Sequence, residues 1–490
     1  MISPINFCND IFNTIKVWIL VFAIIFSGCA SLKPVNMRAI KSGLNRAKNS
    51  LVSLERAVFL EQKGLGKIIN SDADPILLLE LGIAYSYQGK FEESNRILEE
   101  AFNYYQREED RAKISLSRIF LEATESSLTE GLGDYQLNDY EKVLLHSIKA
   151  LNFLMLGDSI GARVEIERAY IVQKNILKKS EDELIELKEK YDNKLHSLFG
   201  RVESKSRISE TKFKEMFSTD KLLNRTSLTQ SEKQLVQSVR SSYENAFTEV
   251  LSSLTFQLNG EYGNALPPLK RAVKITDNQF VKKAKEIREK DAGVLASKNN
   301  FYLFVFKEFA PEKRSRSLTF GNPFTGAINH VSIARLVPQV SQRINIRLSS
   351  VNKRRVVSPG SLTNINALAL KQYQSELPYL AAKAMIRLAV QVVKDYYLRK
   401  ELGQGGAILA TIFNLAAQKA DLRTWTLLPG KILYLSEKYG PGKMKLSIEF
   451  EGKKISEGNI IPIEDNKITV AFARVFDNDV KLYYHKFLRR

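Results

Sequence analysis

The chain has 490 residues, of which 44% are hydrophobic and 26% charged, and a net charge of +19. These values are typical of globular proteins and exclude a wholly disordered chain, and the length allows two or three domains. A strongly basic protein attracts polyanions, but the basic clusters lack the interleaved aromatic residues that stack on bases, so we expect no nucleic-acid partner. With Cys8 and Cys29 as its two cysteines, the chain has no disulfide framework and no four-cysteine metal site.

An apolar run near the start of the chain sets the expected compartment. Residues 17–26 are all hydrophobic and lead into Ser27-Gly28-Cys29. The run is too short for a permanent membrane-spanning helix, which needs about 20 apolar residues, and it fits the core of a cleaved signal. An uncleaved anchor is the alternative interpretation.

This segment resembles a bacterial lipoprotein signal, with a short hydrophobic core and small residues before a cysteine. The resemblance implies a signal peptide over 1–28, acylation of Cys29, and a short tether over 29–44. Ala30 follows the cysteine, and the resemblance then favours the outer membrane, with the protein facing the periplasm. Membrane attachment is therefore expected through the N-terminal lipid.

Helical periodicity is strongest over residues 75–105, where two amphipathic helices are predicted to meet at Gln88-Gly89-Lys90. The pattern resembles a tetratricopeptide repeat, with a second copy at 143–173 and a third at 245–274. Gly82 and Ala150 are 68 residues apart, which is twice the 34-residue period of this repeat. A degenerate copy would fill 109–142, and residues 45–64 would supply an opening helix. The third copy fits least well, because Pro267-Pro268 would fall inside its second helix.

The repeat resemblance assigns residues 45–295 to an all-α solenoid that binds partners on its concave surface. Residues 76–79 and 144–147, in the first helices, are expected to line that groove. Small residues would let paired helices approach, and tyrosine and leucine would fill the space between repeats. The packing positions that we expect are Gly82, Tyr85, Ala101, Ala150, Gly157, Ala162, Ala169, Ala265 and Ala272.

A charged insertion, residues 171–240, interrupts the repeats. Leu177, Leu184, Tyr191 and Leu198 recur every seven residues, which predicts a long helix with a coiled-coil-like seam. Two interpretations stay open. The segment is either a helical pair packed along the solenoid or a protruding arm for self-association.

The pattern changes near residue 295 from helical periodicity to short strands. Strands are predicted at 301–306, 331–336, 344–348, 468–475 and 480–484, and alternating apolar residues start at Met444. Between them a helix over 364–400 is expected to kink at Pro378, to break at Gly403-Gln404-Gly405-Gly406, and to resume over 407–419. We therefore predict an α+β multidomain protein whose C-terminal domain, 296–490, contains a small antiparallel sheet and folds independently.

A second resemblance rests on the C-terminal half. Residues 420–425 (ADLRTW), Leu428-Pro429 and Pro441-Gly442 are similar to a family of uncharacterised bacterial lipoproteins. Its members join a tetratricopeptide-like N-terminal region to a C-terminal mixed domain. This resemblance covers most of the chain and implies no established activity.

The motifs of common catalytic sites are missing from the sequence. It contains no His-Glu-x-x-His and no Gly-x-Ser-x-Gly, and its four histidines lack metal-ligand spacing. We therefore predict no enzyme activity, no metal and no cofactor. His146 is expected to be a surface or packing residue. Asp421, Arg423 and Trp425 form either an ion pair beside a packed indole or a recognition patch, in which arginine and tryptophan are favoured.

These expectations together describe a lipid-anchored periplasmic scaffold or adaptor. Its repeat groove would bind a protein partner during assembly or regulation of an envelope complex. The alternative is a binding module for peptidoglycan or another anionic envelope polymer, attracted by the charge of +19.

Overall fold

The computed structural model describes residues 76–113, 135–177, 182–201, 209–290, 299–322, 324–339, 344–350, 353–417, 420–450, 453–476 and 480–488. All of these residues belong to one compact unit, Ala47–Arg490. The predictions for Cys29, the signal peptide, the tether, the opening helix and residues 114–134 lie outside the described residues.

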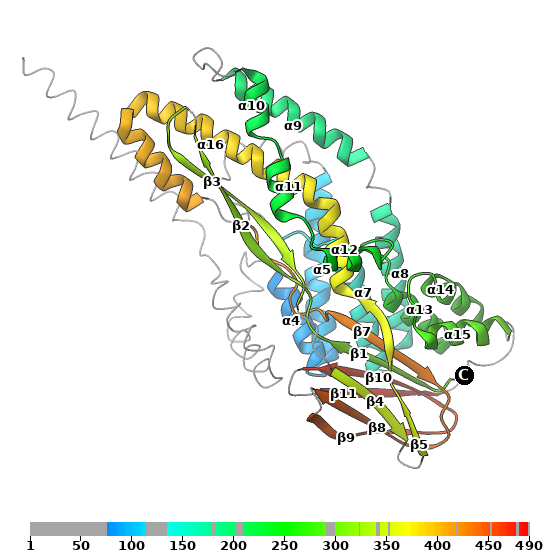
Figure 1. Cartoon of the computed structure of the whole chain (residues 1–490). Helices are drawn as coiled ribbons and strands as arrows, with labels where there is room; N and C mark the ends of the chain where they lie inside the picture. The colour runs from blue at the N-terminus through cyan, green and yellow to red at the C-terminus, as the bar shows by residue number, and fades with distance from the viewer. Residues whose placement is uncertain are drawn as a thin grey trace, which may run out of the picture. The chain divides into compact units, whose positions relative to one another are not determined.

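Three helical hairpins occupy the positions predicted from the periodicity (Figure 1). Within and between the hairpins, α4 packs on α5, α5 on α7, α7 on α8 and α8 on α13. The third hairpin differs from the prediction at its second helix. A 3₁₀ turn comes first, so Pro267 and Pro268 lie at the start of that helix and not in its interior. Proline is tolerated at this position. The hairpins are α4 (Ile76–Tyr87) with α5 (Phe91–Lys113), α7 (Asp139–Met155) with α8 (Ser159–Leu177), and α13 (Ala246–Leu258) with η2 (Tyr262–Ala265) and α14 (Leu266–Ala272).

The three hairpin turns have the same backbone geometry. Gly89, Gly157 and Gly260 have φ values of 77°, 85° and 78°, which glycine adopts without the strain that a side chain would add. In each turn the residue after the glycine donates its N–H to the carbonyl five positions earlier, as in a Schellman motif. These bonds are Lys90 to Tyr85 at 3.0 Å, Asp158 to Phe153 at 2.9 Å and Glu261 to Phe256 at 2.8 Å.

A five-stranded sheet in the order β11-β10-β1-β7-β6 forms the centre of the C-terminal half. Its middle strand, β1, pairs in parallel with β10 and antiparallel with β7, so this sheet is mixed and the predicted small antiparallel sheet does not describe it. Every residue of β1 from Phe301 to Phe306 is buried, as expected for a strand covered on both faces. The strands are β1 (Phe301–Lys307), β6 (Gly360–Asn364), β7 (Lys431–Glu437), β10 (Lys467–Val475) and β11 (Val480–Leu488).

Two smaller sheets complete the strands. One is antiparallel in the order β5-β4-β8-β9 and meets the five-stranded sheet where β9 packs against β11. The other is a ribbon of β2 and β3, whose β3 lies along α16. The strands are β2 (Glu312–Gly321), β3 (Ile328–Val337), β4 (Ile344–Ser350), β5 (Lys353–Val357), β8 (Gly442–Phe450) and β9 (Lys453–Ile463).

Helix α16 (Ile365–Ala417) is the longest element, and its backbone leaves helical geometry at Gly403, where φ is 61°. The predicted break at this glycine is confirmed. Pro378 lies inside the first leg, where no backbone angle leaves the helical range, and a kink at this proline stays a prediction.

The charged insertion packs within the chain. It forms α9 (Asp182–Gly200), α10 (Glu210–Met216), α11 (Asp220–Thr226) and α12 (Gln230–Gln237), of which α9, α11 and α12 contact α16. Leu198 on the predicted seam is buried, whereas Leu177 is exposed. Because α9, α11 and α12 pack on α16, the described residues form neither a helical pair along the hairpins nor a free arm.

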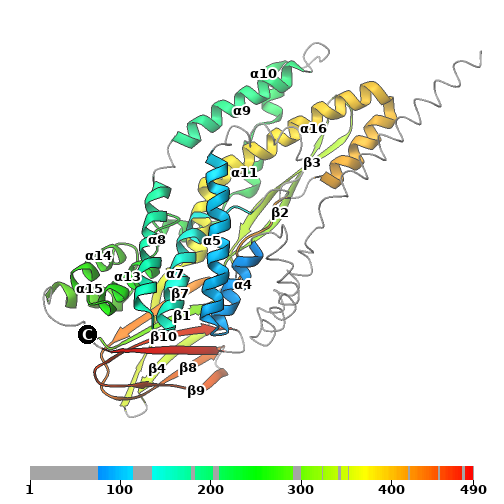
Figure 2. The ribbon, with the colours of Figure 1, turned by 180° about the vertical axis from the view of Figure 1, so that it is seen from behind.

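The predicted boundary near residue 295 marks a change of secondary structure and does not separate compact units. Helix α7 contacts β10 and β11, and α13 contacts β6 (Figure 2). The ring of Phe247 on α13 lies 5.6 Å from Phe304 and 5.5 Å from Phe306 on β1. The remaining helix, α15 (Gln279–Lys290), packs on β7. The hairpins therefore share the core of the sheet.

Candidate functional site

An extended segment between α16 and β7, residues 420–430, lies against the first two hairpins. We call it the strap. Glu80 on α4 accepts hydrogen bonds from the backbone N–H of Thr426 at 2.6 Å and of Leu427 at 2.9 Å. The hydroxyl of Tyr87, at the end of the same helix, donates to the Leu427 carbonyl at 2.7 Å. The hairpins thus bind the strap through its backbone.

A second buried carboxylate, Glu141 on α7, also binds the strap. It accepts hydrogen bonds from the Tyr135 hydroxyl at 2.7 Å, the Asn138 N–H at 2.8 Å and the Trp425 N–H at 3.3 Å. Burial raises the pKa of Glu141 above its usual value, although these hydrogen bonds act to lower it. Two carboxylates on neighbouring hairpins therefore satisfy nearby N–H groups of one extended segment.

Residues that were predicted to line a partner groove are buried within the chain. Ile76, Leu77 and Leu79 are buried, and so are all residues from Leu144 to Ser147. The prediction of an open groove at these positions is wrong, because the chain fills the space with its own residues. A partner would have to bind elsewhere on the hairpins.

The cluster Asp421, Arg423 and Trp425 lies on the strap. Arg423 donates to both oxygens of Asp421, from Nε to Oδ1 at 2.9 Å and from Nη2 to Oδ2 at 2.7 Å. Burial acts to raise the pKa of Asp421, but the bonds and charge of Arg423 outweigh it and hold that pKa below its usual value. Trp425 is fully buried. The packing interpretation therefore fits the structure, whereas a recognition patch would need an accessible indole.

The predicted packing positions of the hairpins are buried, except for Gly157, which is half-buried. A Cβ atom placed on Gly82 would lie 2.6 Å from the side chain of Leu98 on α5, so α4 and α5 approach closely there. One added to Gly157 would meet the ring of His485 on β11 at the same distance. The other predicted positions, all buried, are Tyr85, Ala101, Ala150, Ala162, Ala169, Ala265 and Ala272.

This close approach predicts the effect of overpacking. Gly82→Leu is expected to lower the free energy of unfolding by about 1–3 kcal/mol or more, because the fully buried side chain of Leu98 occupies the space that the new side chain needs. Urea denaturation measures the change. Gly200→Leu is the matched control, since a Cβ on Gly200 meets nothing within 4 Å. Equal stability of the Gly82 variant and the wild type would contradict the packing of α4 on α5.

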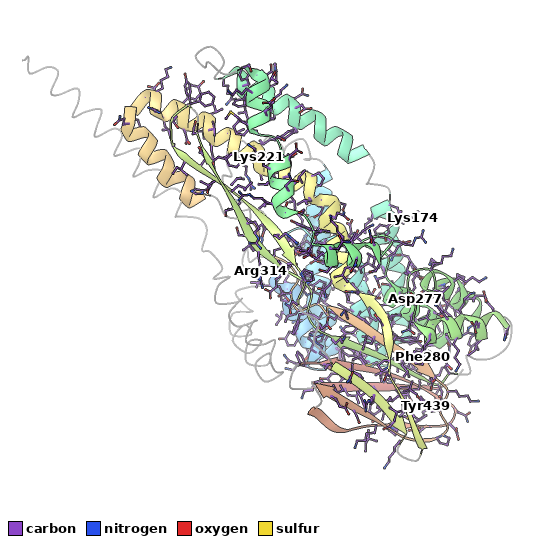
Figure 3. The ribbon with its side chains drawn as sticks, viewed as in Figure 1. Lys174, Lys221, Asp277, Phe280, Arg314 and Tyr439 are labelled. Atoms are coloured by element: carbon purple, nitrogen blue, oxygen red, sulfur yellow. The ribbon has the colours of Figure 1, made fainter. Side chains whose placement is uncertain are left out.

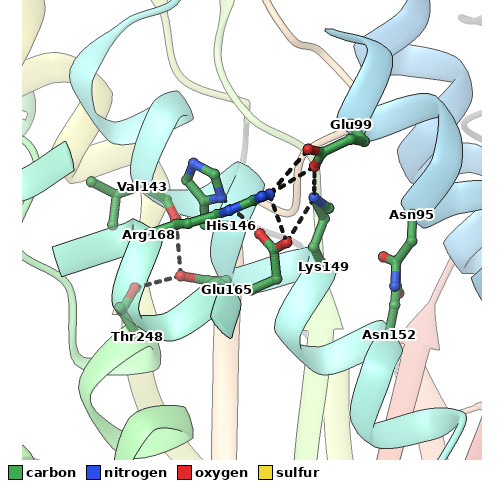
Figure 4. A network of polar contacts seen from close by, with 10 residues as sticks. Asn95, Glu99, Val143, His146, Lys149, Asn152, Glu165, Arg168 and Thr248 are labelled. Atoms are coloured by element: carbon green, nitrogen blue, oxygen red, sulfur yellow. Dashed lines mark hydrogen bonds and ion pairs between the residues drawn. The ribbon is translucent and has the colours of Figure 1, made fainter. Parts of the chain in front are cut away.

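A charged network joins α5, α7 and α8 (Figure 4). The His146 Nδ1 and Glu165 Oε2 atoms are 2.8 Å apart, and Lys149 donates to Glu165 Oε1 at 2.8 Å. Arg168 donates to the same oxygen at 3.1 Å and to Glu99 at 2.9 Å, and Lys149 also donates to Glu99. Two carboxylates balance two cations when the histidine is neutral, so the network brings no net charge into the hairpins.

The environment of His146 favours this neutral form. Burial lowers its pKa, and the charges of Lys149 and Arg168 act in the same direction, against the opposing effect of Glu165. The sequence prediction of a surface or packing residue did not include this network. The only signal of this network in the sequence is a spacing of three residues on each of two adjacent helices. His146 and Lys149 have this spacing on one helix, and Glu165 and Arg168 have it on the next. Residues three positions apart lie on the same face of a helix.

The lowered pKa predicts how stability depends on pH. The unfolded chain binds a proton at His146 near pH 6.5, whereas the folded chain binds it only at lower pH. Because the unfolded state then binds more protons, this contribution to stability is complete above that pH and is lost as pH falls toward the folded-state pKa. Between pH 7.5 and 5.5 the wild type is expected to lose stability relative to His146→Gln. Denaturation at several pH values measures the difference, and a constant difference would contradict the assignment.

The described ranges contain no group of three His, Cys, Asp or Glu residues placed to hold a metal ion. A cavity beneath α13 and α15 is lined by Gln257, Arg288 and Tyr302 among others, and it has room for about one water molecule. Arg288 and Tyr302 both donate to Gln257 Oε1, at 2.9 Å and 3.2 Å. The polar side chains that line the cavity therefore bind one another.

An exposed apolar stripe lies along α8. Ile160 is 67% exposed, Val164 44% and Ile171 59%. Their spacings of four and seven residues place them on one face of the helix. Arg163 and Glu167 beside the stripe form an ion pair of 3.1 Å, so the apolar face has a polar border.

Comparison of the whole chain with protein-family models, with curated proteins and with solved structures found no match in any of the three.

Proposed function

We propose that this chain is a non-enzymatic scaffold or adaptor of the bacterial envelope, anchored through lipid at Cys29. Its hairpins would form a tetratricopeptide-like solenoid that binds a protein partner on the α8 face. The observation that supports this choice is the exposed stripe of Ile160, Val164 and Ile171. Since the positions predicted to line the groove are buried, binding would use the outer face. An amphipathic helix of the partner would match a stripe with this spacing.

Site-specific crosslinking in intact cells tests this surface. A photo-reactive amino acid at position 164 and another at 171 should give the same protein adduct, because the two positions lie two turns apart on one face. Position 356 on β5 is the control, since Val356 is 55% exposed and lies outside the hairpins. Adducts at 356 alone, or none at 164 and 171, would contradict the proposal. An adduct of twice the chain mass would identify the occupant as a second copy and exclude the adaptor role of this face.

The anchor makes a separate prediction. Cys29→Ala is expected to abolish incorporation of labelled fatty acid, because Cys29 is the only cysteine after the apolar run. Each buried methylene contributes about 0.8 kcal/mol to membrane affinity, so the variant should also leave the membrane fraction more readily. Cys8→Ala is the matched control and should keep the label. Unchanged labelling of the Cys29 variant would contradict lipid anchoring.

Binding of an anionic polymer is the second candidate, favoured by the net charge of +19. Basic residues are spread over the molecule, as Lys174 on α8, Lys221 on α11 and Arg314 on β2 illustrate (Figure 3). Salt distinguishes the two candidates. Binding to a polymer should weaken steeply with ionic strength, whereas binding to the apolar α8 stripe should weaken less.

A further inference from the structure

The bend of α16 and the turn between β2 and β3 form one structural unit, which we call the tip (residues 322, 324–329 and 392–406). Asn322 Nδ2 donates to the Val392 carbonyl at 3.3 Å, and Asn329 Nδ2 donates to Asp395 Oδ2 at 2.7 Å. Arg399 donates to the Thr325 carbonyl. These bonds fix the β2–β3 turn against the helix.

Large apolar side chains of the tip are exposed. Ile328 is 49% exposed, Tyr397 42% and Leu402 37%. The Tyr397 hydroxyl donates to the Arg201 carbonyl at 2.9 Å, which holds the ring in place. Phe324 packs edge-on against Tyr396 with ring centres 5.9 Å apart.

Exposed basic residues lie close in sequence to Tyr397 and Leu402 on α16. Lys394, Arg399 and Lys400 are exposed, against one exposed acid in the same stretch, Glu401, while Asp395 is buried. Tyrosine, aliphatic side chains and basic residues together are typical of protein surfaces that lie at the headgroup level of a bilayer. Positive charge complements anionic lipid.

The second leg of α16 has the composition and length of an interfacial segment. Residues 402–417 contain no charged residue, and Gly403 at φ 61° turns the chain between the two legs. The leg after Gly403 is about 21 Å long at 1.5 Å per residue, shorter than the hydrocarbon core of about 30 Å. The structure contains no described helix long and apolar enough to cross a membrane.

We propose that the tip is a membrane-surface contact that places Ile328, Tyr397 and Leu402 at the boundary between headgroups and acyl chains of an anionic phospholipid bilayer. Charge complementarity favours lipid as the occupant, because exposed Lys394 and Lys400 lie within three residues of exposed Tyr397 and Leu402 on α16. This contact is separate from the lipid at Cys29 and from the α8 stripe. It would hold the chain at the membrane surface by a second point.

Fluorescence quenching by brominated lipid tests the contact in the full chain. Leu402→Trp is bound to phosphatidylglycerol vesicles with brominated acyl chains, and the emission of the wild type is subtracted. The added indole is expected to lose its emission. Val356→Trp is the control, because Val356 is also exposed and lies on β5, and it should keep its emission. Both variants carry the same N-terminal segment, so attachment through that segment affects them equally.

Charge reversal tests the electrostatic part. Lys394→Glu with Lys400→Glu should abolish the quenching at position 402. Lys438→Glu with Lys443→Glu makes the same change of net charge at two exposed lysines and should leave it unchanged. Tyr439, next to the first of these control lysines, lies far from the bend of α16 (Figure 3).

Two results would overturn the proposal. One is that the indole introduced at position 402 is quenched no more than the indole introduced at position 356. That result is expected if a protein, and not lipid, covers the tip. The other is that both lysine pairs have equal effects on the quenching. Neither result depends on partner binding at α8.

Discussion

Trp425→Ala is expected to lower the free energy of unfolding by about 3–5 kcal/mol, the usual range for removing a buried aromatic side chain. Trp425 is one of the largest fully buried side chains in the described structure. It lies on the strap, and its backbone N–H is bound by Glu141. Loss of the ring would leave a cavity where the strap meets the first two hairpins. Urea or thermal denaturation of the full chain measures the change.

A graded series sharpens this test. The Trp425 indole N–H has no hydrogen-bond partner among the described residues, so Trp425→Phe removes volume without breaking a bond and should cost less than the alanine variant. Val356→Ala, at a side chain 55% exposed, should change stability little. If the alanine and phenylalanine variants both match the wild type, the strap is not docked as described.

The strap is one connection between the first hairpin and the sheet. Another is Arg474 at the end of β10, which is fully buried. Its guanidinium lies 4.6 Å from the ring centre of Tyr87, 4.3 Å from Phe309 and 5.0 Å from Phe476. It also donates to the Glu308 carbonyl at 2.8 Å. Cation–π contacts strengthen when the cation is desolvated, so this arginine stabilises α4 against the sheet.

The elements that the sequence predicted well are those coded by local signals. The turns at Gly89, Gly157 and Gly260 need a left-handed backbone that glycine supplies, and the helices beside them follow a 3.6-residue period. Strand β8 alternates Met444, Leu446 and Ile448, all of which are buried. Short-range geometry determines each of these features, so one stretch of sequence is enough to find it.

The pairing of distant segments was not predictable in the same way. Strand β1 pairs in parallel with β10, which begins more than 150 residues later, at Lys467, and nothing in either strand specifies that partner. The composition of the strap drew attention to Asp421, Arg423 and Trp425, but not to its contacts with Glu80 and Glu141. A tryptophan beside an arginine has the same sequence whether it lies at an interface or in a core. Only the fold decides between these interpretations.

The sequence predicts that residues 296–490 fold independently, but the core that they share with the hairpins leads us to expect the opposite. A fragment of residues 296–490 is expected to aggregate or to unfold without a cooperative transition. Phe304 and Phe306 on β1 would lose their contacts with Phe247 of α13, and the strap would lose Glu80 and Glu141. Exposed apolar strands with unsatisfied N–H groups favour association between copies. Solubility and the urea transition followed by circular dichroism measure the outcome.

Co-expression supplies the control for this experiment. Residues 36–295 produced together with 296–490 should restore a soluble complex, because all contacts between α13, α7 and the sheet can re-form without a covalent link between the halves. A second pair carrying Glu80→Ala in the first fragment should assemble less well, since two N–H groups of the strap, at Thr426 and Leu427, would be left without their acceptor. A soluble 296–490 fragment that unfolds cooperatively by itself would show that the sheet does not need the hairpins. The boundary near residue 295 would then separate two domains after all.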